Sequence, residues 1–512
     1  MGAGLWIRAN DTVTPNTFQP PCNKLVATLA TTQTESFTLS TNFVIHWFRQ
    51  DLRITDNPSL SAAARQSTVL PIYILDDHNC GEYSLGAASR WWLHHSLIAL
   101  NKSLKHNLYI YRGDPKKILI DLIRKHDVKA VYWNRCYEPW QLKRDKQIRN
   151  ILNKEKISLE EFNGSLLWEP WDTLKADGTP YKVFTPYYKN ACANGSPPRI
   201  PISKPLKITF SKSEKNNLTI DELGLLTKHQ WHKKLHADWQ PGELNAQNRL
   251  HDFINHKLTH YKTGRDFPAL DSVSRLSAHL HFGEISPLQA WYGVKSVEAS
   301  DGQEHFIREL AWREFSYHLL YYFPKLPKQN LQSKFDAFPW SDNKDYLLCW
   351  QKGQTGHPLV DAGMRQLWQT GYMHNRIRMV TGSFLVKNLL LHWHHGAQWF
   401  WDCLIDADLA NNSASWQWIA GCGADAAPYF RVFNPSTQGQ KFDPDGEYTR
   451  QFVPELAKLP NKYLFNPWEA PKDILQKAGV ELGKNYPFPI VDFKLSRIRA
   501  LDAYKTIRNN NA

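Results

Sequence analysis

The sequence is poor in the features that mark several classes of protein. Its seven cysteines are odd in number and form no CxxC pair, which excludes a disulfide framework and a cysteine zinc site. No stretch approaches the roughly 18 consecutive apolar residues of a membrane span, because polar residues interrupt the best candidate, 379–393. The histidine-rich run 392–395 lacks a carboxylate or cysteine at ligand spacing, so we expect no metal site.

Basic residues and tryptophan, by contrast, are abundant. Lysine and arginine number 62 against 49 aspartates and glutamates, which gives a formal net charge of +13. This surplus favours nucleic acid as a partner, then an anionic membrane, although solvated lysines on a soluble protein explain it equally well. The 21 tryptophans exceed what single-domain cores need. We expect some of them to stack on bases or a cofactor, or to carry electrons.

The first part of the chain alternates strand and helix patterns. Since domains usually hold about 100–200 residues, the 512 residues predict two to four domains. No GxGxxG follows the first strand, which excludes the ordinary dinucleotide fingerprint. The alternation predicts right-handed βαβ units and a doubly wound parallel sheet. Strands are predicted at 43–48, 68–75, 107–111, 130–134 and 157–162, and helices at 59–66, 87–105, 115–126 and 140–153.

The second part reads as mostly helical. Between the two parts, a stretch rich in proline, lysine and asparagine predicts an interdomain linker. Helices are predicted at 244–261, 304–322, 359–369, 375–391 and 398–404. We therefore predict a disordered extension at 1–41, an α/β domain at 42–170, a linker at 171–243 and a mostly α-helical C-terminal domain at 244–512.

Serine hydroxyls and one arginine gather just before a helical stretch. Ser272, Ser274 and Ser277 surround Arg275, shortly after the segment 261–268. Hydroxyls, free backbone N–H groups and an arginine at a helix start make a phosphate cradle. A plain serine cap of the helix is the alternative interpretation.

One face of the helix predicted at 304–322 is also informative. Glu309, Trp312, Arg313 and Ser316 stand at i, i+3, i+4 and i+7. A carboxylate, an indole and a guanidinium together suit a flat polar ring such as a nucleobase. The alternative is an exposed Glu–Arg pair beside a half-buried tryptophan.

Carboxylates, amides and indoles crowd the segment 404–418. The residues are Asp406, Asp408, Asn411, Asn412, Trp416 and Trp418. A helix interior does not favour Asp and Asn, so these side chains are expected to bind something. Carboxylate oxygens accept hydrogen bonds from ring N–H groups and ribose hydroxyls. A capped turn between helices is the other interpretation.

Taken together, these motifs resemble the photolyase/cryptochrome family, and specifically class I cyclobutane pyrimidine dimer photolyases. The resemblance covers about residues 43–505. It is carried by the segments 47–53, 274–277, 309–315, 355–365, 373–376, 406–412, 416–418 and 425–431, whose order and spacing match the family.

The resemblance implies a non-covalent FAD in the helical domain. Arg378 would pair with Asp406 beside the flavin ring, Asn412 would face its N5, and Glu309 would assist catalysis. Val273 stands where the family often has a hydroxyl. A relay of Trp416, Trp393 and Trp340 would carry electrons. The implied cofactor-binding residues are Tyr261, Val273, Ser274, Arg275, Leu276, Ser277, Phe306, Asp406, Ala407 and Asp408.

The same resemblance implies damaged DNA as substrate. Excited reduced FAD would donate an electron to a dimer flipped out of the duplex, the cyclobutane ring would split, and the electron would return. Basic charge would add salt-dependent affinity. The implied DNA-binding residues are Arg265, Glu309, Trp312, Arg313, Ser316, Asn375, Arg376, Met379, Trp418 and Gln438.

Three other functions were weighed. The reaction of a (6-4) photolyase resembles acid–base catalysis by two histidines in the pocket. This chain has Asn375 and Met379 at the corresponding positions, which argues against that function. A cryptochrome photoreceptor tends to have Asp or Cys where this chain has Asn412. The DASH type of cryptochrome stays open, although it usually lacks the second indole of the pair Trp416 and Trp418. A DNA-binding module without flavin would not need the Asp406–Asn412 cluster.

Further expectations follow from the resemblance. The α/β domain should hold an antenna chromophore, methenyltetrahydrofolate or a deazaflavin, near the interdomain cleft and the segment 133–140. We expect a monomer in the bacterial cytoplasm, with the nucleoid.

Overall fold

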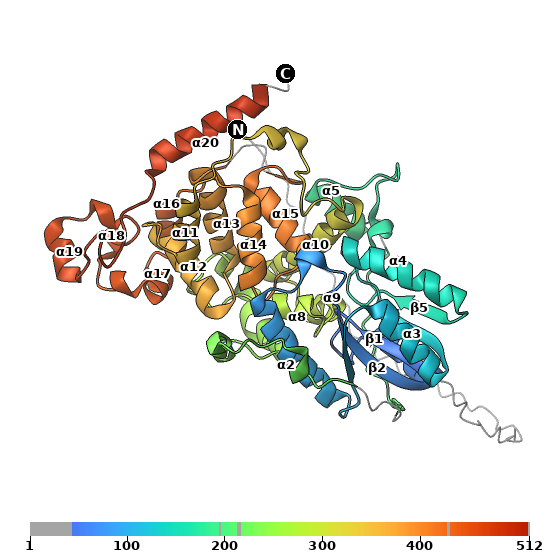
Figure 1. Ribbon diagram of the computed structural model, residues 1–512. Coiled ribbons are helices and arrows are strands. Elements are labelled where there is room, and N and C mark those ends of the chain that lie inside the picture. The colour runs from blue at the N-terminus through green and yellow to red at the C-terminus, as the bar shows by residue number, and fades with distance from the viewer. Residues whose placement is uncertain (1–42, 194–195, 212–216, 427–430, 510–512) are drawn as a thin grey trace, which may run out of the picture. The chain divides into compact units, whose positions relative to one another are not determined.

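A five-stranded parallel sheet forms the first part of the chain. The computed structural model describes residues 43–193, 196–211, 217–426 and 431–509, so the extension predicted at 1–41 lies outside it. The strand order is β3-β2-β1-β4-β5, which confirms the doubly wound sheet. Figure 1 labels β1, β2 and β5 of this sheet. Its elements are β1 (Phe43–Phe48), α1 (Pro58–Gln66), β2 (Thr68–Leu75), α2 (Ala87–Ser103), β3 (Tyr109–Arg112), α3 (Pro115–His126), β4 (Val128–Asn134), α4 (Pro139–Lys154) and β5 (Ser158–Phe162).

Both faces of this sheet are covered, because successive side chains of a strand point to opposite faces. In β1, Val44 and Phe48 belong to the core that includes Trp91 of α2. Ile45 belongs to the opposite core, with Leu119 of α3. A strand buried on both faces reads as a continuous apolar run, and this is why β1 was predictable.

The rest of the described chain is helical. The α-helices are α5 (Phe184–Ala193), α6 (Glu243–Asp252), α7 (Tyr261–Gly264), α8 (Ser277–His281), α9 (Pro287–Lys295), α10 (Asp301–Tyr322), α11 (Lys344–Lys352), α12 (Pro358–Thr370), α13 (Asn375–Ser383), α14 (Trp393–Cys403), α15 (Leu409–Ala420), α16 (Pro435–Phe442), α17 (Glu447–Phe452), α18 (Asn461–Leu464), α19 (Lys472–Ala478) and α20 (Phe493–Asn509). The shorter turns are η1 (Gly81–Tyr83), η2 (Pro170–Thr173), η3 (Asp221–Leu223), η4 (Gln230–Ala237), η5 (Phe253–Lys257), η6 (Leu258–His260), η7 (Ser333–Ala337), η8 (Phe384–Asn388), η9 (Pro454–Leu456) and η10 (Pro467–Glu469).

Two predicted helices are less regular than expected. The helix predicted at 244–261 is α6 followed by the π-helical turn η5, the 3₁₀ turn η6 and α7. The helix predicted at 375–391 is α13 followed by the π-helical turn η8. A π-turn inserts one residue into the helical ladder, and a periodic pattern does not reveal this.

The segment predicted as a linker returns to the sheet. The backbone N–H of Ser211 donates to Val69 O of β2 (3.0 Å), and the N–H of Leu218 donates to Ile110 O of β3 (2.9 Å). The segment also contains α5, which the sequence did not predict. The domain boundaries given above stay a prediction.

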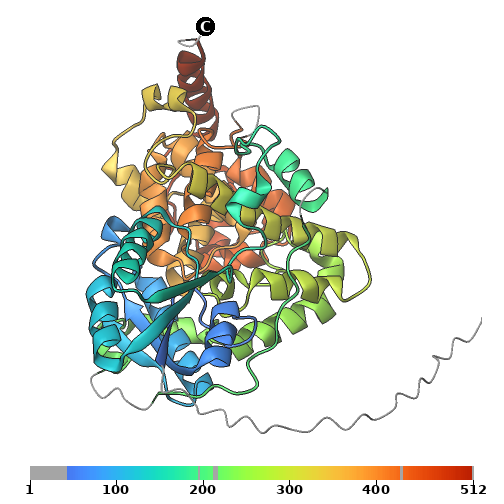
Figure 2. The same ribbon diagram turned by 90° about the vertical axis from the view of Figure 1, so that its right-hand side faces the viewer.

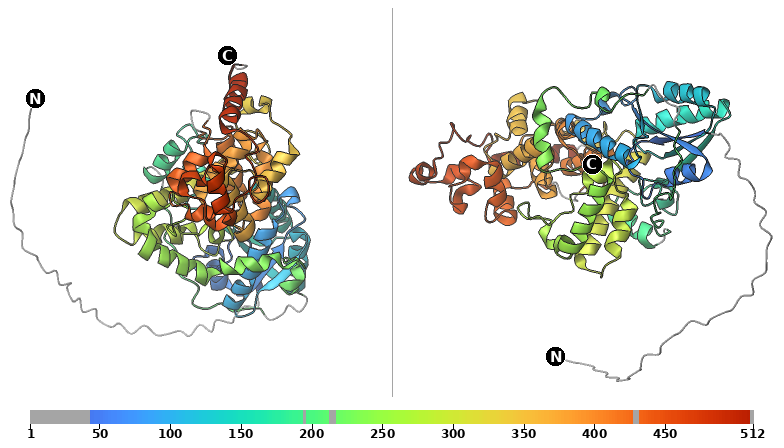
Figure 3. Two further views of the ribbon diagram at one scale, coloured as in Figure 1. Left: turned by 90° about the vertical axis from the view of Figure 1, so that its left-hand side faces the viewer. Right: turned by 90° about the horizontal axis from the view of Figure 1, so that it is seen from below.

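The α/β part is joined to the helical part by buried contacts. Arg53, fully buried after β1, donates to the carbonyls of Gly283 (2.9 Å) and Gly164 (2.6 Å). Gly283 has φ +68°, and a Cβ there would lie 2.1 Å from Gln50 O, so only glycine fits. In Figure 2 the strands and the helical part are seen side by side, and Figure 3 shows α17 to α19 far from the sheet.

Six cysteines fall among the described residues, and all are free; Cys192 is exposed, Cys349 is half-buried, and Cys80, Cys136, Cys403 and Cys422 are buried. In the described part, no helix has the length and apolarity to cross a membrane. The same residues contain no group of three or more His, Cys, Asp or Glu that could hold a metal ion.

Candidate functional site

A cavity of about 720 Å³ lies in the helical part, between α7, α10, α13 and α15. All ten residues predicted to bind a cofactor line it, as do Glu309, Arg378 and Asn412. So do Arg265, Trp312, Arg313, Ser316, Asn375, Met379, Trp416 and Trp418. Segments far apart in the sequence thus meet around one space.

The serine–arginine loop forms one wall. Arg275 has φ +51°, and its guanidinium lies 5.6 Å from the ring of Tyr372 and 5.8 Å from that of Trp239. The hydroxyl of Ser274 accepts from the N–H of Leu276 at 3.4 Å. Leu276, not a serine, is the N-cap residue of α8, so the alternative of a serine cap is wrong.

Asp406 faces the cavity with accepting capacity left. Nη2 of Arg378 donates to both of its carboxylate oxygens, at 3.1 and 2.9 Å. Nε of Arg378 donates to Met373 O at 2.7 Å, which fixes the guanidinium. Each carboxylate oxygen accepts about two hydrogen bonds, so Asp406 can still accept a donor from a ligand.

Asp408, in contrast, is saturated by the protein. It caps α15: its Oδ1 accepts from N and Nδ2 of Asn411, at 2.8 and 2.6 Å. Its Oδ2 accepts from the hydroxyl of Tyr317 and contacts Nδ1 of His281 at 3.4 Å. Burial alone would raise the pKa of Asp408, but hydrogen bonds from His281 and Tyr317, with the charges of His281 and Arg313, lower it below its usual value. Asp408 therefore holds the wall in place.

The polar face of α10 is divided between two ion pairs. Nη1 of Arg265 donates to Oε1 of Glu309. Nη1 of Arg313 donates to Oε1 of Glu314 at 2.8 Å. Glu309 and Arg313 therefore do not pair with each other, as the alternative interpretation of the sequence supposed. Each has another partner, which the i, i+4 spacing on α10 does not reveal.

Trp312 stands on an aromatic support. Its ring lies 3.8 Å from that of Phe184 in α5, with an angle of 9° between the planes. Phe184 in turn stacks on Tyr188 at 5.7 Å. The stack fixes one face of the Trp312 indole, and the same residue lines the cavity.

Around the start of α13, one residue is turned away from the cavity. His374 is the N-cap residue of α13, and its Nδ1 accepts from the N–H of Arg376 at 3.3 Å. Burial lowers the pKa of His374 to about 4. Asn375 and Met379 line the cavity and His374 does not, in agreement with the sequence prediction.

Two residues predicted to bind DNA lie outside the cavity lining. Arg376 donates to Asp266 Oδ1 at 2.7 Å, and its guanidinium lies 4.2 Å from the ring of Phe442. Gln438, on α16, is half-buried. The structure does not bring these two to the cavity wall, and their contact with DNA stays a prediction.

The three tryptophans of the predicted relay lie at different depths. Trp416 lines the cavity and is 4% exposed. Gly396 of α14 allows its close packing, since a Cβ there would lie 2.1 Å from Cη2 of Trp416. Trp393 lies one turn before Gly396 and contacts His392, whose ring is 5.0 Å from the half-buried Trp340.

Sequence reasoning missed part of the lining. His281 and Tyr372 line the cavity, and Tyr317 bonds Asp408. No spacing rule connects these residues with the segment 404–418, because their contacts are long-range. Asn411 had been noticed within the polar segment but given no role.

The residues present fit FAD. Nε of Arg275 is buried and has no hydrogen-bond partner among the described residues. Ser274 and Ser277 line the same cavity, so the loop offers hydroxyls and a guanidinium to phosphate groups. Asp406 offers accepting oxygens, and apolar and aromatic side chains such as Phe306 supply walls for a flat ring.

Comparisons with known proteins agree with this fit. Residues 44–205 match the family model described as DNA photolyase, and residues 306–506 match the one described as FAD binding domain of DNA photolyase. A deoxyribodipyrimidine photo-lyase of Agrobacterium fabrum is 47% identical over 478 residues, 92% of this chain and 99% of that protein. Cryptochrome-2 of Arabidopsis thaliana is 39% identical over 472 residues, 88% of this chain and 77% of that protein.

A solved structure bears on the class. The crystal structure of a bacterial class III photolyase from Agrobacterium tumefaciens superposes with a TM-score of 0.89 and 46% identity, covering 93% of this chain and 100% of that one. The resemblance to class I in particular is therefore not supported. The matches do show the family: this chain belongs to the photolyase/cryptochrome flavoproteins.

Proposed function

We propose that this protein repairs cyclobutane pyrimidine dimers in DNA with light, as a deoxyribodipyrimidine photo-lyase, a carbon–carbon lyase. The observation that carries the proposal is that one cavity joins a wall suited to FAD with a wall suited to bases. The 47% identity to a protein of that name over nearly its full length supports it. The class III photolyase structure supports placing the chain in that class.

Each wall has a defined task. Bound reduced FAD would supply, under light, the electron that breaks the two carbon–carbon bonds joining the bases, and take it back. Arg275, Ser274 and Ser277 would hold its phosphates, and the Arg378–Asp406 pair would hold its ring edge.

The opposite wall would receive the dimer. The indole of Trp312, fixed by Phe184, and the indole of Trp418 offer flat apolar surfaces to two joined pyrimidines. Glu309 supplies a carboxylate that can hydrogen-bond base N–H groups. Because such bonds strengthen as negative charge develops on the bases, Glu309 contributes to catalysis by electrostatic preorganisation. Asn375 and Met379 complete this wall.

The structure favours this substrate over a (6-4) photoproduct. That repair resembles acid–base catalysis, which needs an imidazole placed to move protons. His374 is turned away, and its lowered pKa, about 4, keeps it neutral. His281 lines the cavity but is bound to Asp408.

The test is illumination of the reduced protein with oligonucleotides that carry one lesion each. We expect restoration of cyclobutane dimers, in single and double strands, and no change in (6-4) photoproducts. Trp312→Ala should weaken binding of the dimer by about 1–3 kcal/mol through lost stacking. Binding without light-dependent repair would place the protein among photoreceptors.

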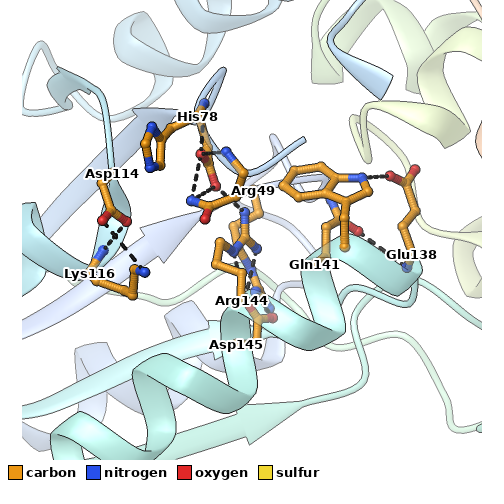
Figure 4. A network of polar contacts seen from close by, with 11 residues as sticks. Arg49, His78, Asp114, Lys116, Glu138, Gln141, Arg144 and Asp145 are labelled. Carbon is orange, nitrogen blue, oxygen red and sulfur yellow. Dashed lines mark hydrogen bonds and ion pairs between the residues drawn. The ribbon is translucent and has the colours of Figure 1, made fainter. Parts of the chain in front are cut away.

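One expected binding site for the antenna chromophore, at the edge of the sheet, is occupied by side chains of the protein. In doubly wound sheets, ligands bind outside the carboxyl ends of the strands. Here the guanidinium of Arg49 lies over the rings of Trp47 and Trp133, 5.2 and 4.9 Å from their centroids. Nε of Arg144 donates to Asp145 at 2.9 Å, and Arg49 pairs with the same carboxylate (Figure 4). These contacts leave little reason to place a pigment at this edge.

A second cavity, of about 290 Å³, suits a pigment better. It lies between α5, α9 and α10 and is lined by Trp168, Tyr188, Trp291 and Lys295. The rings of Trp168 and Trp291 are 5.5 Å apart, and Nζ of Lys295 lies 4.4 Å from the Trp291 centroid. Indoles can stack on a flat ring, and a lysine attracts an acidic tail. Methenyltetrahydrofolate has both a flat ring and an acidic glutamate tail, and a deazaflavin has the flat ring, so the cavity is proposed for either.

Trp291→Ala should remove the antenna absorbance from protein made in a host that synthesises both pigments. The ratio of FAD to protein should not change, because Trp291 lies outside the flavin cavity. Trp171→Ala is the matched control, since Trp171 is 42% exposed and lines neither cavity. An unchanged absorption spectrum of Trp291→Ala would remove the pigment from this cavity.

A further inference from the structure

Two residues that were both predicted to bind DNA form an ion pair at the cavity. They are Arg265, which follows α7, and Glu309 of α10, which was also predicted to assist catalysis. In the structure Nη1 of Arg265 donates to Oε1 of Glu309, and both residues line the cavity. Their side chains are 16% and 35% exposed. While this pair is closed, neither group is fully free for DNA.

The neighbouring residue makes a similar pair outside the cavity lining. Asp266 accepts from Nη2 of Arg376 at 2.7 Å, with side chains 36% and 17% exposed. Arg376 also packs on Phe442, and it does not line the cavity. Arg265 and Asp266, which are adjacent in the sequence, thus form two ion pairs of similar exposure. Of these two pairs, the Arg265–Glu309 pair is the one that lines the cavity.

Replacing Glu309 with a phosphate as the partner of Arg265 costs little free energy. Partly exposed ion pairs contribute little to stability. A DNA phosphate accepts from a guanidinium through two parallel hydrogen bonds, and it releases counterions on binding. Phosphate can therefore displace Glu309 from Arg265.

Resting on the proposed function, we propose that the Arg265–Glu309 pair is a latch that determines damage specificity. When Arg265 binds a phosphate, the Glu309 carboxylate is released toward the cavity. A flipped-out dimer gives Glu309 new donors. Undamaged DNA does not, so Glu309 competes with the phosphate for Arg265 and weakens non-specific binding.

The test is a double-mutant cycle measured in the dark by fluorescence anisotropy. The proteins are wild type, Glu309→Gln, Arg265→Gln and the double variant, with undamaged duplex and with a duplex carrying one dimer. Glu309→Gln should tighten binding of undamaged DNA by up to about fivefold. The slope of log affinity against log salt should steepen by up to about 0.9, the value of one phosphate contact. In the Arg265→Gln background, Glu309→Gln should change neither quantity.

Removal of any acid near DNA could mimic the first result, and Asp266→Asn controls for this. It removes an acid of equal exposure whose partner is not Arg265, so the latch predicts a smaller gain that persists in the Arg265→Gln background. A Glu309→Gln gain that also persists there, or no gain at all, overturns the latch. Bound-flavin absorbance shows that each variant is folded.

Light-dependent repair by the wild type is read separately. If the wild type repairs dimers but the double-mutant cycle shows no coupling between Arg265 and Glu309, the latch is wrong and the proposed function stands. If the cycle shows the coupling but the wild type repairs no dimers, the latch stands and the proposed function is wrong.

Discussion

Replacing Asp408 with alanine is expected to lower the free energy of unfolding by about 3–5 kcal/mol, the range for removing one partner of a buried polar network. The change removes the N-cap of α15 and leaves the buried hydroxyl of Tyr317 and the ring of His281 without their acceptor. Because α15 carries Asn412, Trp416 and Trp418, the flavin should be lost as well. Denaturant unfolding followed by tryptophan fluorescence, with FAD release measured beside it, gives both quantities.

Asp406→Asn is the control for this result. Asp406 is also buried, but it accepts from Arg378 and keeps accepting capacity toward the cavity. Its replacement should lower flavin affinity with a much smaller loss of stability. Equal losses of stability in the two variants would contradict the scaffold role of Asp408.

The pH dependence gives an independent check of the same carboxylate. The pKa of Asp408 is lower in the folded protein than in the unfolded chain. Its stabilisation is therefore fully present above the unfolded value, about 4, and is lost as pH falls through the folded value. The wild type should lose stability on acidification more steeply than Asp408→Ala.

Much of the α/β part was predictable because its signals are local. Strands such as β1 are continuous apolar runs, and Pro115 begins α3 directly after Asp114, whose side chain caps it. Helices such as α15 were not predicted, because Asn411, Asn412 and Ser413 interrupt the apolar pattern. Short-range spacing does not show helices whose stability comes from packing.

The candidate site divides in the same way. Many of the residues that line the cavity were found through motifs, whereas His281, Tyr372 and the contacts among the lining residues were not. The Arg265–Glu309 contact spans 44 positions and the Tyr317–Asp408 contact 91. These contacts decide that Asp408 is a scaffold and that Glu309 is restrained, and no local pattern encodes them.

The substitution Trp416→Phe is expected to stop the light-driven reduction of bound, oxidised flavin. The reduction is followed by the flavin absorbance under blue light. Of the three relay tryptophans, Trp416 is the one that lines the cavity, and Trp393 and Trp340 are not part of the lining. A phenyl ring keeps an aromatic side chain at this position, although it lacks the outer indole atoms that lie against Gly396, and it is much harder to oxidise than an indole. The first electron transfer should therefore fail while the fold is kept.

Repair by chemically pre-reduced Trp416→Phe should survive, because repair returns its electron and needs none from the relay. This readout separates the relay from substrate binding. Trp350→Phe is the matched control: Trp350 is fully buried, its ring lies 6.2 Å from that of Trp416, and its Nε1 donates to Thr381 O at 3.0 Å. It should photoreduce normally. If Trp350→Phe loses photoreduction and Trp416→Phe retains it, the first donor lies on the Trp350 side and the relay through Trp393 is wrong.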